Sequence, residues 1–286
     1  MKKIIFHLST IIVLYSCQTS AADKNINPIS DNFVVILDLS DRLIHNNHQV
    51  DFDTAAISAV FQKFEKSVQR NLVVKSNDKF SIRIIPQNNS RIDINNLQNS
   101  LSIDLSKNSA SQKLNALNDF KSNFSKNLSN LYQQAFLGNK DSDYPGVDIW
   151  QYFNEQINTD LGLNCNNKIL VLTDGYFDFE DHNHGIRKGN TATITSPLLS
   201  KMKQDNWQLF SDINGIGLQT VALNIQSKWI ICGIQSKPEC KDLLEAKKLS
   251  YLWKKWLLQS GQKNIFEPII NTNSLKAKSL ILEYFK

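Results

Sequence analysis

The sequence predicts an α/β domain with a doubly wound, mostly parallel central sheet flanked by helices. Two apolar runs, residues 33–37 and 168–172, each end abruptly in an acidic turn. Runs that are apolar on both faces are typical of strands buried inside a parallel sheet. Further strand-like runs alternate with stretches in which apolar residues recur at helical spacing. That alternation is typical of parallel strands joined by crossover helices.

The expected elements follow from these periodicities. Phe80 to Ile85 alternates and is stopped by Pro86, whereas the polar stretches 87–109 and 176–195 are expected to be mainly loops. In chain order we expect a strand ending at Asp38, a helix over 53–69, a strand over 80–85, an edge strand around 101–105, helices over 111–137 and 148–158, a strand ending at Asp174, a strand over 218–225, a helix over 239–259, a short strand over 264–270 and a helix over 272–285.

The N-terminal segment has the pattern of an export signal. Lys2 and Lys3 precede an apolar stretch over 4–15, which is shorter than the roughly 20 residues that span a bilayer. Leu14-Tyr15-Ser16-Cys17 resembles the lipobox of bacterial lipoproteins. The resemblance implies that residues 1–16 are a signal peptide, that Cys17 is acylated and enters the bilayer, and that 17–31 form a flexible tether before a domain over 32–286. The alternative is an ordinary signal peptide with an incidental cysteine.

Charge and cysteine content narrow the class of protein. The formal charge of +5 falls to +3 when Lys2 and Lys3 leave with the signal, and no dense basic block indicates nucleic-acid binding. An exported compartment permits disulfides, and Cys232 and Cys240 flank a Gly/Ser/Pro loop and could pair. The alternative is that both, with Cys165, are buried thiols. The chain has no CxxC pair, so a zinc or redox site is not indicated.

Two acidic motifs carry the chemistry. Asp38-Leu39-Ser40-Asp41-Arg42 follows the first strand, and Thr173-Asp174-Gly175 follows a later one. The carboxyl ends of parallel strands share one edge of a sheet, so Asp38 and Asp174 are expected to meet there. Two adjacent carboxylates need a cation, a proton or an arginine.

These motifs resemble those of the von Willebrand factor A domain family. In that family DxSxS, a threonine from a second loop and an aspartate from a third hold Mg²⁺ or Mn²⁺, whose open position takes a carboxylate from a partner protein. Asp38 and Ser40 match the first two positions of DxSxS, and Asp174 matches the third-loop aspartate. The resemblance implies a metal-ion-dependent adhesion site at these residues, and Asp41 and Thr173 are expected to modulate it.

The sequence departs from the family at two positions. Arg42 replaces the second serine of DxSxS, and Asp148 stands where the second loop would supply threonine. In one interpretation Arg42 turns outward and Asp38, Asp148 and Asp174 hold the cation through oxygen ligands. In another, Arg42 pairs with Asp148 or Asp174 and replaces the cation. In a third, Asp38 and Asp174 only cap turns and helix N-termini.

The other histidine-containing stretches give weaker signals. His182 and His184 follow three acids and could form a second metal site, although a solvated polar loop is the simpler interpretation. His45 and His48 are interpreted as surface residues. No nucleophile elbow, P-loop or dinucleotide fingerprint is present.

Three functions are consistent with the sequence. We expect a lipid-anchored module of the bacterial cell envelope, on the outer membrane or periplasmic side, that binds an envelope or extracellular protein and is not an enzyme. The alternatives are a structural envelope component with a vestigial, Arg42-substituted site, and a metal-dependent hydrolase acting on phosphate esters.

Overall fold

The computed structural model describes residues 29–286 except 86, 88–92, 145, 178–193 and 204. Seven strands of this part form one sheet in the order β3-β2-β1-β4-β5-β6, with β7 also paired to β5. Every pairing is parallel except that of β2 with β3. The strands are β1 (Ser30–Asp38), β2 (Lys79–Ile85), β3 (Ser102–Asp104), β4 (Cys165–Leu172), β5 (Lys228–Ile234), β6 (Asn264–Ile265) and β7 (Ile269–Ile270).

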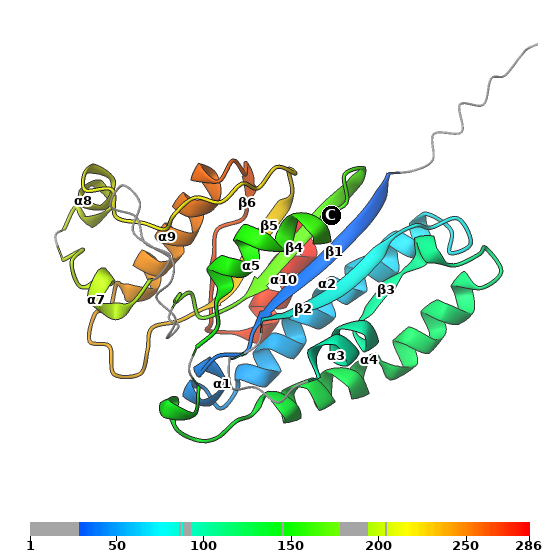
Figure 1. Cartoon of the computed structure of the whole chain (residues 1–286), viewed down its shortest axis with the longest axis horizontal. Coiled ribbons are helices and arrows are strands. Elements are labelled where there is room, and N and C mark those ends of the chain that lie inside the picture. Colours follow the sequence, from blue (N-terminus) through cyan, green and yellow to red (C-terminus); the bar gives the residue numbers. More distant parts are fainter. Residues whose placement is uncertain (1–28, 86, 88–92, 145, 178–193, 204) are drawn as a thin grey trace, which may run out of the picture.

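Helices cover both faces of this sheet (Figure 1). Alternate residues of β1 face opposite layers: Phe33 packs with α2, α4 and α10, whereas Val34 packs with α5 and α9. The predicted mostly parallel α/β sheet flanked by helices is therefore confirmed. The described helices are α1 (Arg42–His45), α2 (Gln49–Arg70), α3 (Ile94–Ser100), α4 (Lys113–Ala135), α5 (Ile149–Glu155), α6 (Ile157–Asp160), α7 (Ser196–Leu199), α8 (Trp207–Ile213), α9 (Glu245–Gln259) and α10 (Ser274–Tyr284).

The strand order reverses at β1. This strand pairs with β2 on one side and with β4 on the other, and Leu37 lies opposite both Ile84 and Leu172. The chain therefore leaves β1 and β4 side by side at the same edge. In open α/β sheets the ligand crevice lies at this point, outside the carboxyl ends of the strands.

One predicted strand is wrong. Residues 218–225 form none of the sheet strands, although Leu218, Val221 and Leu223 are buried, and the strand next to β4 is β5, which begins at Lys228. Side chains from the helices satisfy the backbone of 218–225 in place of a ladder: Trp150 and Trp256 donate to the Gln219 carbonyl at 2.9 and 2.8 Å. Both stretches are apolar and β-branched, so periodicity alone could not tell which one pairs.

Other boundaries differ in detail. The last predicted strand is divided into β6 and β7, with Pro268, which has no backbone N–H, between them. The predicted helix over 148–158 is two short helices, and the helix predicted from 239 begins at Glu245. β1 starts at Ser30, two residues before the predicted boundary. Among the described helices, none combines the length and apolar composition that crossing a bilayer requires.

Candidate functional site

The loop after β1 and the loop after β4 are joined directly by a hydrogen bond, at the place where the strand order reverses. Thr173 Oγ1 donates to Asp38 Oδ2 at 2.8 Å, and the Ser40 backbone N–H donates to Asp38 Oδ1 at 2.9 Å. Thr173 Oγ1 in turn accepts from the Gly175 N–H at 3.0 Å. The structure thus brings Asp38, Ser40 and Thr173 together, as predicted.

Asp174 belongs to the same buried group. Its Oδ1 accepts from the Tyr176 N–H at 3.1 Å, and it is almost as buried as Asp38. Burial raises the pKa of Asp174 well above its usual range, and the nearby charges of Asp38 and Asp41 raise it further. Asp38 and Asp174 are therefore close enough to repel each other.

The pKa of Asp38 is raised as well. Burial is the largest cause and outweighs the charge of Arg42 and the hydrogen bonds from Thr173 and Ser40, which lower it. Two neighbouring buried carboxyl groups with raised pKa values repel each other when both are ionised, and the described groups around them do not offset this. Such a pair is relieved by a shared proton or by a cation.

Arg42 lies beneath the site, contrary to both interpretations made from sequence. Its Nε donates to the Asp38 backbone carbonyl at 2.7 Å, and its two terminal nitrogens donate to Asp53 Oδ1 and Oδ2 at 3.2 and 2.6 Å. The side chains of Arg42 and Asp53 are both fully buried. The guanidinium neither turns outward nor pairs with Asp148 or Asp174.

Asp53 was missed as a functional neighbour. It also accepts from Gln49 Nε2 at 2.9 Å and from the Tyr132 hydroxyl at 3.0 Å, so its charge is fully engaged. Burial alone would lower the pKa of Arg42, but Asp53 and Asp38 raise it. A signal existed in the sequence, because an aspartate on the apolar stripe of a predicted helix needs a partner.

The absence of a side chain at Gly233 lets β5 pack closely against Thr173 and Arg42. Gly233, on β5, has φ +101°, a conformation that side chains disfavour. A Cβ there would lie 3.0 Å from the Thr173 carbonyl oxygen and 3.7 Å from a terminal nitrogen of Arg42. β5 therefore supports the site from below.

Asp148 caps a helix. Its Oδ1 accepts from the Gln151 N–H at 2.8 Å, at the start of α5. Gln87 ties this second loop to the first, since it donates to the Leu39 carbonyl at 2.7 Å and accepts from the Gly146 N–H at 2.9 Å. Asp148 thus caps α5, in a loop that is held beside the Asp38 loop.

A histidine with two carboxylates lies at the rim. His45 Nε2 is 3.0 Å from Asp141 Oδ1 and 3.8 Å from Asp41 Oδ2, and Lys237 Nζ is 3.9 Å from the same Asp41 oxygen. One ligand atom from each of Asp41, His45 and Asp141 lies within 4.8 Å of the others. Imidazole with carboxylates suits a transition metal.

This rim group was not predicted, because Asp141 is remote in sequence and His45 was interpreted as a surface residue. The His45 side chain is only 9 % exposed, whereas His48 is exposed as predicted. His182 and His184 lie outside the described residues, and so does Cys17.

The expected bridge between Cys232 and Cys240 is not formed. All three described cysteines are free thiols. Cys232 points into the core between β5 and the α2 and α10 layer, whereas Cys240 Sγ contacts Glu245, at the start of α9 on the other face. The sheet therefore separates the two sulfur atoms, and burial raises the pKa of Cys232.

The oxygen-only set at the sheet edge fits a hard cation. Asp38, Ser40, Thr173 and Asp174 offer carboxylate and hydroxyl oxygens, the ligands that Mg²⁺ and Ca²⁺ prefer. Two buried carboxyl groups lie close together, and the neighbouring guanidinium is committed to Asp53. The residues present are therefore compatible with a divalent ion.

Comparison with known proteins does not assign the chain to a family. No protein-family model matches the chain, and no curated protein matches it. Among solved structures, a match is proximal thread matrix protein 1 (PTMP1) from the mussel byssus, with 9 % identity and a TM-score of 0.35. The match covers 90 % of this chain and 47 % of that one, so the chain spans about half the length of the protein it matches.

Proposed function

We propose that the chain is a lipid-anchored module of the bacterial cell envelope, with a von Willebrand factor A-like domain that binds an envelope or extracellular protein. The observation that carries the proposal is the 2.8 Å hydrogen bond between Thr173 and Asp38, which joins the two family-like loops where the strand order reverses. A protein-binding edge at this point agrees with the usual place of ligand sites in such sheets.

The proposed ligand set for Mg²⁺ or Mn²⁺ is Asp38, Ser40 and Asp174, with Asp148 from the second loop. When bound, the ion would supply an electrophilic position for a carboxylate of the partner. Thr173 holds Asp38 in place, and Gln87 keeps the second loop beside the first. Arg42 donates to the backbone carbonyl of Asp38 and pairs with Asp53, so its guanidinium does not occupy the proposed metal position.

A structural envelope component without metal is the second candidate. It is favoured by one observation, because both oxygens of Asp38 already accept hydrogen bonds and the raised pKa of Asp174 favours its protonated form. A proton would then take the place of the ion. The phosphoesterase alternative has less support, since Arg42, which was to orient the phosphoryl group, is fully buried.

Calorimetric titration of Mg²⁺ and Mn²⁺ into the metal-stripped chain separates these candidates. We expect saturable binding that is lost in Asp174→Asn and kept in Asp51→Asn, whose side chain is 83 % exposed. Asp148→Asn should weaken binding if this residue is a ligand and leave it unchanged if it only caps α5. Absence of binding in the wild type would reject the metal site and favour the structural component.

Two further measurements test the partner and the anchor. Capture of an envelope protein should require Mg²⁺, disappear in EDTA and in Asp174→Asn, and persist in Asp51→Asn. Incorporation of labelled palmitate in cells should be lost in Cys17→Ser. Normal labelling of that variant would show that Cys17 is not the acylated residue.

A further inference from the structure

The opposite edge of the sheet, where the parallel strands begin, gathers basic side chains. Lys63, Lys66 and Arg70 lie on the last turns of α2, Lys228 begins β5 and Lys286 follows α10, whereas Lys168, in the middle of β4, is buried. Lys63 shows their proximity, because burial lowers its pKa and the charges of Lys66, Lys168, Lys286 and Arg70 lower it further. We call Lys63, Lys66, Arg70, Lys228 and Lys286 the basic end.

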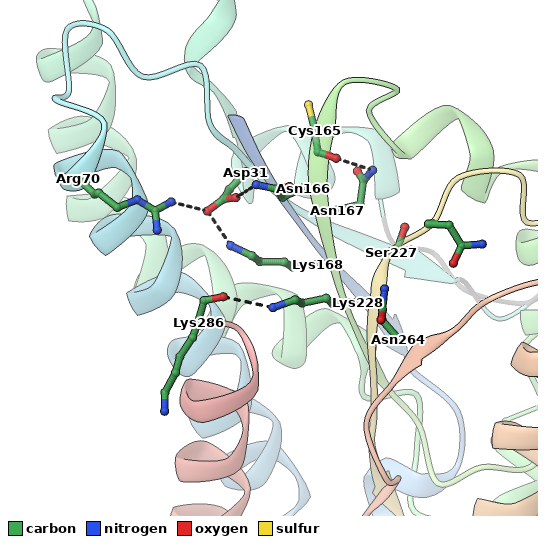
Figure 2. Close-up of a pocket in the computed structure, with 11 residues that line it drawn as sticks. Asp31, Arg70, Cys165, Asn166, Asn167, Lys168, Ser227, Lys228, Asn264 and Lys286 are labelled. Atoms are coloured by element: carbon green, nitrogen blue, oxygen red, sulfur yellow. Dashed lines mark hydrogen bonds and ion pairs between the residues drawn. The ribbon is translucent and has the colours of Figure 1, made fainter. Parts of the chain in front are cut away.

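The acids of this edge are largely neutralised. Asp31 is buried and accepts from Lys168 at 2.6 Å and from Arg70 at 3.1 Å, as Figure 2 shows. Glu65 pairs with Lys121, Asp104 with Lys79 and Asp160 with Arg83, and Asp78 is fully buried. Arg70, Lys168 and Lys228 also line a polar cavity of about 330 Å³, whose wall includes Asn166 and Ser227 (Figure 2). The outer charge of this edge is therefore positive.

Exposed apolar side chains surround the same edge. Leu163, in the turn before β4, is 85 % exposed, and Ile29, at the start of β1, is 61 % exposed. Leu72 and Val74, in the loop between α2 and β2, are 57 % and 50 % exposed. Figure 1 shows these turns around the place where β1 begins.

The loop that carries Leu72 is held in a fixed conformation. Leu72 has φ +58°, in the left-handed region that leucine rarely adopts. The Leu72 carbonyl accepts from the N–H groups of Lys75 and Ser76, and the buried Lys113 Nζ donates to the Ser76 carbonyl at 2.7 Å. The loop thus presents apolar side chains outward on a pinned backbone. Strained backbone of this kind tends to occur at functional positions.

We propose that the basic end, with its rim of Leu72, Val74 and Leu163, is a docking surface for anionic phospholipid headgroups. Basic residues near an anionic membrane are attracted to its surface, and neighbouring apolar side chains can enter the interfacial region. The mixture of cations and exposed leucines at one edge matches that chemistry. The inference rests on the proposed lipid anchor only for its orientation toward the bilayer.

The length of the tether supports this occupant. Ile29 lies 12 positions after Cys17, so a fully extended tether spans at most about 40 Å. The tether joins the domain at the edge of the sheet that carries the basic end, because β1 begins there. Acylation at Cys17 would raise the effective concentration of lipid at this edge, so weak individual contacts would act together with the anchor.

Vesicle sedimentation of the unlipidated mature chain, carrying Cys17→Ser, tests the proposal in EDTA. We expect binding to vesicles of phosphatidylcholine mixed with phosphatidylglycerol, little binding to phosphatidylcholine alone, and weaker binding at high salt. Lys63→Glu/Lys66→Glu, which reverses two charges of the basic end, should reduce partitioning at least about tenfold. The matched control, Lys201→Glu/Lys203→Glu, makes the same charge change after α7 and should bind like the parent.

A second pair of variants tests the apolar rim. Leu163→Ser should weaken binding several-fold, whereas Leu209→Ser, at a 54 % exposed leucine on α8, should not. Equal binding to both vesicle types, or equal loss in both lysine pairs, would overturn the proposal. Because acylation and metal are absent from the assay, its failure is distinct from failure of the proposed partner-binding function.

Discussion

Asp31 and Asp38 are both buried in β1, yet their surroundings differ at the two ends of the strand. Asp31 receives hydrogen bonds from Lys168, Ser67 and Arg70, at 2.6, 2.7 and 3.1 Å. Asp38 receives bonds from the Ser40 backbone and the Thr173 hydroxyl, and it lies near a second carboxylate. Burial raises the pKa of both, but the partners of Asp31 outweigh it and the net pKa of Asp31 is lowered.

The difference separates a structural charge from one that is available for function. At the start of β1 the protein supplies the counter-charge, because Asp31 forms ion pairs with Lys168 and Arg70. At the end of β1 the guanidinium of Arg42 is committed to Asp53, and among the described residues Asp38 and Asp174 have no ion pair with a cationic side chain. Perturbed carboxylates of the second kind are typical of binding and catalytic sites.

The largest expected effect comes from the ion pair below the site. Arg42→Ser restores the family-like serine but leaves Asp53 buried without its cation, so the free energy of unfolding should fall by about 3–5 kcal/mol. Denaturant titration measures it. Arg42→Ser/Asp53→Ser should recover part of the loss, and an unchanged midpoint in the single variant would contradict the assigned pairing.

A smaller loss is expected at the start of β1. Asp31→Asn keeps the shape of the side chain but leaves the buried Lys168 ammonium without its counter-ion, which should cost about 2–3 kcal/mol. The control is Arg70→Gln, whose side chain is 62 % exposed and whose ion pair is worth under about 1 kcal/mol. Equal losses in the two variants would show that Lys168 is not the main partner.

An Asp→Asn substitution at the other end of the sheet, Asp174→Asn, should stabilise the protein instead of destabilising it. A carboxyl whose folded pKa is raised stabilises the fold below its unfolded pKa of about 4, and this contribution is lost as pH rises through the folded pKa. In EDTA the melting temperature should therefore fall between mildly acidic and alkaline pH. Asp174→Asn should flatten that slope and raise the melting temperature by about 2–4 °C at alkaline pH.

That result has a clear contrary outcome. If melting in EDTA were independent of pH, or if Asp51→Asn changed the slope as much as Asp174→Asn, the Asp38–Asp174 pair would not carry the uncompensated charge. The lowered pKa of Asp31 gives a second check, because its contribution is lost only as pH falls through its folded pKa, below about 4.

The smallest expected effect concerns the thiols near the two ends. Cys165, at the start of β4, is partly exposed and should react with a maleimide in the native protein, whereas the buried Cys232 should react only after unfolding. A reductant should leave the melting temperature unchanged. A shift on reduction, with a Cys232–Cys240 crosslink found by mass spectrometry, would contradict the free thiols.

Sequence patterns predicted most of the sheet but only part of the site. β1, β2, β4 and α2 follow from local periodicity, and the meeting of Asp38 with Thr173 follows from the rule that parallel strands end at one edge. β5 was missed because two apolar stretches competed for one place. The direction of Arg42 and the Asp41–His45–Asp141 group depend on contacts between distant segments, which local patterns do not contain.

The length of α2 sets a distance between the two ends. This helix has 22 residues, so it is about 33 Å long, and it carries Asp53 under the Asp38 loop near one end and Arg70 near the other. With Arg70 resting at a bilayer, the Asp38–Asp174 edge would stand about one helix length above it. The domain would then act as a spacer of fixed height, and partners would be met at that height rather than at the lipid surface.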